Sequence, residues 1–409
     1  MNTSLKRLAL PLASAGIVAL VLPWSSASAG EKPAFSGYNT SAWAAPVMIE
    51  LYEPTIPTFT SPQAELELAY TRVEAETGIA RGRGSWAWPG DGVGEGFKTI
   101  ADALGLPPEV GKQGYPFQVN SEHPSGESEQ KDEPFPGMVM RTSADGERVS
   151  AEVGYSPDGE ADEPKSSDGG GDQPEAPGTP GLPTDQLSDF GSAVTGSSRS
   201  GEGTAATPLL PPELAALVDF TAYSSTSSAD TGTDLVSTES RSVVSDVSLI
   251  GGLVVLEGVT AEMLTTSNGK QGTAEGGREL GTMTIAGNEF TVGPDGVQAG
   301  GENAAIPGLP DDPGKALAEL GLAFSVAKPQ EQSSGDKASG LATGVVVEID
   351  TTKLRSQLRN VPLDDIVGAI PDETGELKSL IGAAANLSPR IVLTLGNAGT
   401  ETDTVQGLT

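Results

Sequence analysis

Much of the chain consists of short runs in which apolar and polar residues alternate, the pattern of a half-buried β-strand. Val47, Ile49 and Leu51 show this pattern near the N-terminus. Similar runs recur in the second half, separated by turn-forming residues, at 217–223, 234–247, 249–256, 259–264, 283–285 and 289–292. The continuous apolar runs 345–347 and 391–395 are typical of buried strands, and we expect them to pair at the centre of a sheet.

Residues 64–77 form a longer run whose pattern changes midway. Leu66, Leu68 and Tyr70 share one face of an extended chain, but the next apolar residues, Val73 and Ala75, have the opposite parity. A one-residue slip turns a strand inside out, so a β-bulge near Thr71–Arg72 is the simplest way to keep one face apolar.

Turn and helix signals complete the fold prediction. Asp145-Gly146 is a strong hairpin signal between the strand-like runs 138–140 and 148–155. Helical spacing or capping residues predict helices at 97–104, 312–320 and 373–385, and shorter ones near 351–358 and 363–370. The sequence therefore predicts a mainly β or α+β protein, with antiparallel β-sheets and a few short packed helices.

A long segment in the middle of the chain has a different composition. Residues 156–207 are rich in Gly, Pro, Ser, Asp and Glu, and only one aromatic residue, Phe190, occurs there. Such a segment buries too little apolar area to offset its ordering entropy, so we expect a disordered acidic linker. It separates an N-terminal β-rich region, 30–155, from a C-terminal β-rich α+β region, 208–409. Strands of the two regions can still pair and form one domain.

The first 29 residues have the three parts of a secretory signal peptide. Lys6 and Arg7 precede an apolar stretch that ends near Leu22, and the small residues Ala27 and Ala29 follow. The apolar stretch is too short and interrupted for a spanning helix. We expect cleavage after Ala29 and a secreted, extracellular product. With no cysteine for lipid attachment and no second apolar span, we expect no transmembrane anchor in the mature chain.

Charge narrows the choice of partners. The chain has 24 Lys and Arg residues against 56 Asp and Glu residues, a formal net charge of −32. Such a surface repels phosphate backbones, so we expect no nucleic-acid partner. The absence of cysteine in an exported chain excludes a disulfide scaffold, so stability must come from buried side chains.

The residues that usually carry catalysis are scarce. His123 is the single histidine, and it lies in a polar stretch before a proline, where a solvated side chain is the simpler interpretation. The Ser-x-x-Lys sequences at 128–131, 267–270 and 334–337 lie in polar segments without the other motifs of a Ser-Lys hydrolase. One histidine and no cysteine exclude a histidine- or cysteine-rich zinc site. We therefore predict no catalytic residues, no metal site and no cofactor.

The most distinctive short motif is residues 86–91, Trp-Ala-Trp-Pro-Gly-Asp. In an extended chain Trp86 and Trp88 point to the same face. Two exposed indoles on one face stack well on sugar rings or on an aromatic partner, and Asp91 adds a polar group beside them. Packing against the β core is the alternative, and the sequence favours it.

The C-terminal half resembles a known group of proteins. Residues 239–254, which contain the sequence SVVSDVSLIGG, are similar to a stretch of secreted actinobacterial choice-of-anchor P-type proteins. The hairpin 284–296 and the closing run 391–398 are similar to that group as well. The resemblance implies a secreted β-rich protein, and it brings no catalytic residue. Members carry alternative C-terminal surface anchors, whereas residues 400–409 here are polar.

Three functions follow in order of preference. The first is a secreted, non-enzymatic extracellular or cell-envelope protein of structural or interaction type, with cell-wall carbohydrate, extracellular carbohydrate or protein as partner. The second is a carbohydrate- or ligand-binding module that uses Trp86 and Trp88. The third is an extracellular hydrolase dependent on His123. The oligomeric state is not readable from the sequence.

Overall fold

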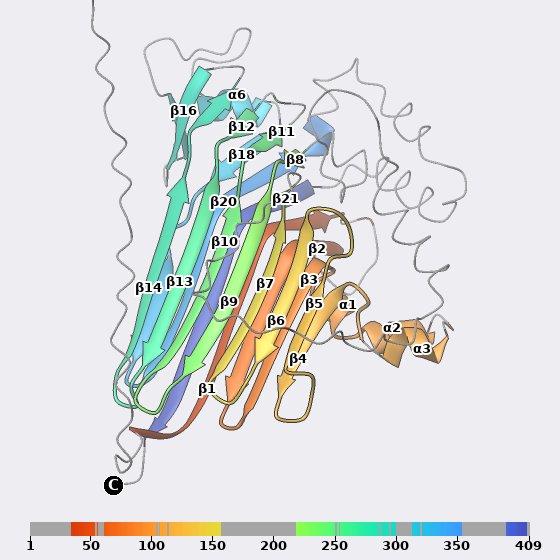
Figure 1. Ribbon diagram of the computed structural model, residues 1–409. Helices are drawn as coiled ribbons and strands as arrows, with labels where there is room; N and C mark the ends of the chain where they lie inside the picture. The colour runs from red at the N-terminus through yellow and green to blue at the C-terminus, as the bar shows by residue number, and fades with distance from the viewer. Residues whose placement is uncertain are drawn as a thin grey trace, which may run out of the picture. The chain divides into compact units, whose positions relative to one another are not determined.

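Antiparallel β-sheets make up most of the computed structural model, which describes residues 34–53, 61–156, 218–299, 313–353 and 390–406 with short gaps (Figure 1). Sheet A has the order β18 (Leu322–Ser325), β20 (Lys337–Asp350), β21 (Arg390–Gln406), β1 (Phe35–Tyr52), β2 (Ala64–Glu76), β3 (Ile79–Trp88), β4 (Gln118–His123), and β19 (Gln330–Ser334) pairs with β20. Sheet B has the order β14 (Gly272–Leu280), β13 (Val259–Ser267), β10 (Val236–Val244), β9 (Tyr223–Thr231), β7 (Arg148–Tyr155), β6 (Met138–Ala144), β5 (Glu129–Asp132). Sheet C has the order β17 (Gly296–Ala299), β16 (Asn288–Gly293), β15 (Met283–Ile285), β12 (Val254–Leu256), β11 (Val247–Leu249), β8 (Val218–Phe220).

The predicted mainly β class is confirmed. The two apolar runs predicted to pair do so, because Val345 lies opposite Leu395 and Val347 opposite Leu393. The predicted hairpin around Asp145 joins β6 to β7. Described helices are few and short: α1 (Asp91–Gly94), α2 (Phe97–Ala103), α3 (Pro108–Lys112) and α6 (Pro313–Glu319).

Strands from the two halves of the chain form neighbouring blocks that meet at one junction in each of sheets A and B. In sheet B, β7 pairs with β9, so that Tyr155 lies opposite Tyr223. In sheet A, β1 pairs with β21 along almost its whole length. Sheets A and B pack face to face, as Figure 1 shows, and all described residues belong to one compact unit. The structure thus joins the N-terminal and C-terminal regions through shared sheets.

Sheet C is the continuation of sheet B across a common bend. Four chain segments leave one sheet and enter the other after two residues, at 221–222, 245–246, 257–258 and 281–282. Backbone bonds cross this line; for example, Ser245 N–H donates to Ala222 O at 2.9 Å, and Gly281 N–H donates to Gly258 O at 2.9 Å. Residues three positions apart normally face opposite sides of a strand, but the two intervening residues shift the side-chain parity by one. Val244 and Val247 therefore both face inward, one on each side of the bend.

Sheet A has a matching line of irregularities. Strand pairing is interrupted, without a change of register, at one position in each of five strands, at Pro46, Ala69, Trp86, Gly344 and Gly396. In β2 the irregular residue is Ala69, with a φ of 49°. The side-chain parity of β2 therefore changes at Ala69, before the predicted position at Thr71–Arg72, and without the extra residue that defines a β-bulge. As a result Tyr70 faces outward, and its predicted place on the face of Leu68 is wrong.

The core differs on the two sides of these bends. Beside sheet C it consists of large apolar side chains such as Phe220, Leu249 and Met283, which pack with Val347 and Leu393 of sheet A. These residues are almost completely buried. This part of the core resembles the interior of an ordinary β-sandwich.

Between sheets A and B the interior consists mainly of alanine, serine and threonine. The Thr402 hydroxyl lies 3.0 Å from Thr40, 3.0 Å from Thr238 and 2.8 Å from Thr265, so it joins two strands of each sheet. All four threonines are buried. Small side chains let the sheets approach closely: a Cβ at Gly84 of β3 would lie 2.8 Å from a Val153 methyl of β7. Hydrogen bonds thus replace part of the apolar contact here.

Some sequence predictions differ from the structure, and others concern residues that the structure does not describe. The polar stretch that contains His123 is partly β4, so His123 ends a strand. The signal peptide 1–29 and the helices expected at 363–370 and 373–385 lie outside the described residues. So do the linker 156–207 after its first residue and the helix expected near 351–358 after Lys353. Within the described part of the chain, no helix has the length and apolar content to cross a membrane.

Candidate functional site

Trp86 lies in the core between the sheets. Its indole contacts Phe117 at a centroid distance of 4.9 Å and Phe135 edge-to-face at 5.5 Å. The residue is 4% exposed and belongs to the large apolar cluster. Its side chain therefore fills the interior of the sandwich.

Trp88 lies in a different cluster, on the outer face of sheet A. Its ring stacks on Tyr70 at 5.4 Å with an interplanar angle of 8°, and Tyr115 meets it edge-to-face. It is 1% exposed. The side-chain parity of β3 changes between Trp86 and Trp88, so the two indoles lie on opposite faces of sheet A. The expectation that they share one face is wrong.

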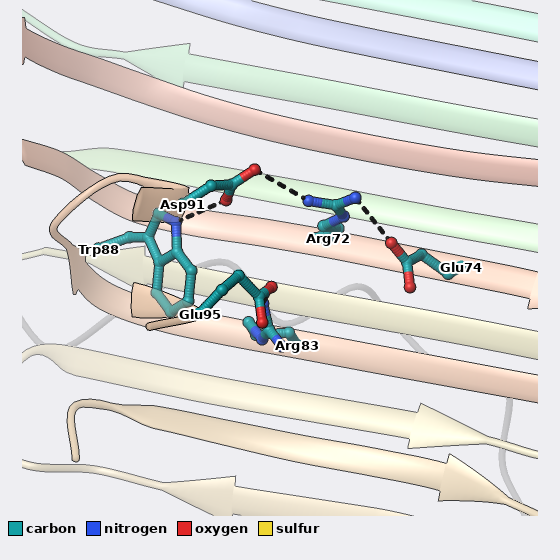
Figure 2. Close-up of polar contacts among 6 residues, drawn as sticks. All are labelled: Arg72, Glu74, Arg83, Trp88, Asp91 and Glu95. Atoms are coloured by element: carbon teal, nitrogen blue, oxygen red, sulfur yellow. Dashed lines mark hydrogen bonds and ion pairs between the residues drawn. The ribbon is translucent and has the colours of Figure 1, made fainter. Parts of the chain in front are cut away.

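Asp91 joins this cluster to the surface, as Figure 2 shows. Its carboxylate accepts a hydrogen bond from Trp88 Nε1 at 3.1 Å and forms an ion pair with Arg72 at 3.3 Å. The Arg83 guanidinium lies 4.9 Å from the centroid of the Trp88 ring and pairs with Glu95. These contacts hold the α1 segment over Trp88. Of the three predicted binding residues, only Asp91 is substantially exposed.

Opposite Trp88 in the pairing of β2 with β3 lies a buried carboxyl group, that of Glu67. Burial, and then the charge and hydrogen bond of Glu65, raise the pKa of Glu67 well above its usual value, with smaller contributions from Asp91 and Glu50. Burial also raises the pKa of Tyr70. A neutral Glu67 carboxyl donates a hydrogen bond to Glu65. No group of three or more potential metal-binding side chains occurs among the described residues.

His123 lies in a small cavity at another place in the fold. The cavity has a volume of about 10 Å³ and is also lined by Asp145 and Arg148. Backbone N–H groups of Glu147 and Arg148, each 2.7 Å from the Asp145 carboxylate, lower the pKa of Asp145. The space holds about one water molecule. No serine is among the residues that line it, so the structure does not bring His123 and a serine together there.

A larger groove lies on the outer face of sheet A, and the sequence analysis missed it. It has a volume of about 270 Å³ and crosses β19, β20, β21 and β1. One row of paired positions across it is Gln330, Leu341, Gly399, Trp43. The next row is Gln332, Ser339, Glu401, Ser41.

Trp43 is the aromatic residue of this groove and is half-buried. Ala42, its neighbour in β1, packs between the sheets, so Trp43 faces outward. On its other side Trp43 lies opposite Arg72, the partner of Asp91. The available sequence signal was the position of Trp43 between Ala42 and Ala44, both suited to a narrow interior.

Comparisons with known proteins add no identification. Neither a protein-family model nor a curated protein sequence matches the chain. The crystal structure of OccK9 (OpdG) from Pseudomonas aeruginosa aligns with 92% of this chain and 100% of its own, at 10% sequence identity and a TM-score of 0.15. A likeness at that score carries no argument about fold or function.

Proposed function

We propose that this protein is exported and acts outside the cytoplasm as a non-enzymatic binding protein of the cell envelope. The observation that carries the proposal is the groove of about 270 Å³ across four strands of sheet A, with a half-buried tryptophan beside polar side chains. Ligand sites combine apolar surface with a few polar groups in this way, and their volumes begin near 300 Å³. The resemblance to secreted actinobacterial proteins and the signal-peptide pattern of residues 1–29 support export.

A rigid platform suits a binding role. Three of the four strands under the groove, β20, β21 and β1, have a paired strand on each side, and β19 pairs with β20. The interior beneath them is held by the threonine hydroxyls around Thr402. A ligand therefore meets a surface that is already formed, which lowers the entropy cost of binding. The indoles predicted to bind, Trp86 and Trp88, serve packing in this arrangement.

Export is tested by producing the full chain in a secreting actinobacterial host and sequencing the N-terminus of the released protein. We expect Gly30 as the first residue. Retention of the uncleaved chain inside the cells contradicts the proposal.

Binding is tested by co-sedimentation of the purified protein with isolated actinobacterial cell envelopes. The variant Leu341→Glu places a charge in the groove, and Val346→Glu places the same charge on the outer face of the same strand, outside the groove. We expect the first to lose envelope binding and the second to keep it. Absence of binding by the unaltered protein, or equal binding by both variants, refutes the role of this face.

A further inference from the structure

The groove on sheet A points to a specific class of ligand. Resting on the proposed binding function, we infer that it binds a neutral glycan chain, with Trp43 as the stacking platform for a sugar ring. The inference depends on the position of the indole, the polar groups beside it and the charge of the surroundings.

The indole of Trp43 lies directly on the backbone of β21. A Cβ at Gly399 would lie 2.5 Å from Trp43 Nε1 and 2.6 Å from Cε2, so no larger residue fits beneath the ring. Glycine in the middle of a strand marks such a close approach. The ring lies over Gly399, packs in part against the cluster of Ala45, Tyr70 and Trp88, and lines the groove with the part that stays exposed. A flat, half-buried indole of this kind offers an apolar surface to the C–H face of a sugar ring.

Polar side chains follow the indole in an ordered row. Gln330 and Gln332 of β19 border the groove on one side, and Ser339, Glu401 and Ser41 cross it next to the Trp43 row. Amide groups both donate and accept, hydroxyls do the same, and a carboxylate accepts. Within the described residues, the side chains of the two glutamines and two serines form no hydrogen bond with one another or with their neighbours. Their polar groups are thus free to bond to ligand hydroxyls.

The two rows match the two surfaces of a pyranose chain. Trp43 and Leu341 provide an apolar row, and the adjacent residues Ser41, Ser339 and Glu401 provide a polar row. Four adjacent strands span three inter-strand spacings, about 14 Å, which suits a short run of sugars better than a single ring. A sugar ring likewise carries C–H groups on its face and hydroxyls at its edge.

Charge and backbone pairing argue against other ligands. Glu401 lies in the groove, and the net charge of the chain is −32, so acidic glycans are repelled. Three of the four strands that the groove crosses are paired on both sides, and the outer edge of β19 lies at the border of the groove, so the groove floor itself offers no edge for an added peptide strand. A neutral, hydroxyl-rich chain is the ligand that fits these conditions.

The inference is tested by titrating the full-length protein with neutral oligosaccharides of β-linked glucose, xylose and mannose and α-linked glucose. Oligogalacturonate serves as the acidic counterpart. Tryptophan fluorescence and calorimetry report binding, because among the tryptophans that the structure describes Trp43 is half-buried and Trp86 and Trp88 are buried. We expect at least one neutral glycan to bind and the acidic one not to bind.

Matched variants assign the binding to the groove. Trp43→Ala is expected to weaken binding at least about tenfold, and the double variant Gln330→Ala/Gln332→Ala tests the same groove without removing a packed ring. The control Tyr52→Ala removes another outward aromatic of β1, which contacts Arg390 outside the groove, and should leave binding unchanged. Circular dichroism and thermal unfolding establish that each variant is folded.

The outcomes separate this inference from the proposed function. If the protein binds cell envelopes but none of the neutral glycans, the glycan inference is overturned while the binding function stands. Glycan binding that survives both groove variants overturns the assignment to Trp43. If the protein binds neither envelopes nor glycans, the proposed function itself fails.

Discussion

Replacement of Glu67 by glutamine should change the pH dependence of stability in a defined direction. Glu67 is 7% exposed, and burial together with neighbouring Glu65 raises its pKa well above 4.5. The folded protein therefore binds this proton more tightly than the unfolded chain does. The stability that the proton contributes is complete below the unfolded pKa and is lost as pH rises toward the folded pKa.

The change in unfolding free energy is limited because only one proton is bound or released. A single group changes the free energy of unfolding by at most about 1.4 kcal/mol per pH unit between its unfolded and folded pKa values. Glu67→Gln keeps a neutral side chain of similar shape and removes the titration. The variant should therefore gain stability relative to the unaltered protein as pH rises above about 4.5, the unfolded value.

Urea unfolding at a series of pH values, followed by tryptophan fluorescence, measures this difference. Glu76→Gln is the matched control, because Glu76 is an exposed carboxyl group at the end of the same strand. The control difference should stay within about 0.5 kcal/mol at every pH. A Glu67→Gln difference that is flat from about pH 5 to about pH 8, or that falls, would refute the assignment of a buried neutral carboxyl.

Three further substitutions test the packing that supports the groove. Trp88→Ala should cost about 3–5 kcal/mol of unfolding free energy, since a fully buried indole is lost; a loss below about 1 kcal/mol in urea unfolding contradicts the observed burial. Thr402→Val should cost about 1–3 kcal/mol, because buried hydroxyls lose their partner, whereas the exposed Thr266→Val should be nearly neutral in the same assay. Gly84→Ala should lower the thermal midpoint through its clash with Val153, at a cost of about 1–3 kcal/mol, and an unchanged midpoint argues against the close sheet approach.

The strands that the sequence predicted are those whose residue pattern alone indicates whether they are buried or half-buried. The runs 345–347 and 391–395 are apolar at every position except Thr394, and the turn at Asp145 bonds to its own backbone, so their structure is readable locally. Strand β3 was missed because Gly82 and Gly84, which have low strand propensity, occupy its inward positions. Those glycines are needed for contact with β7, a strand distant in sequence. Strand β14, rich in glycine and glutamate, was missed for the same reason.

For the candidate site, sequence alone determined that tryptophans are few and that Trp88 and Asp91 lie near one another along the chain. The tertiary structure decided which indole is exposed to solvent. A change of side-chain parity after Trp86 turns Trp88 to the outer face, and the α1 segment covers Trp88 there. Gly399, in a strand more than three hundred residues away, supports Trp43. Exposure depends on what packs over a side chain. In this antiparallel fold the packing residues come from both ends of the chain, so strand pairing and not local pattern places the groove.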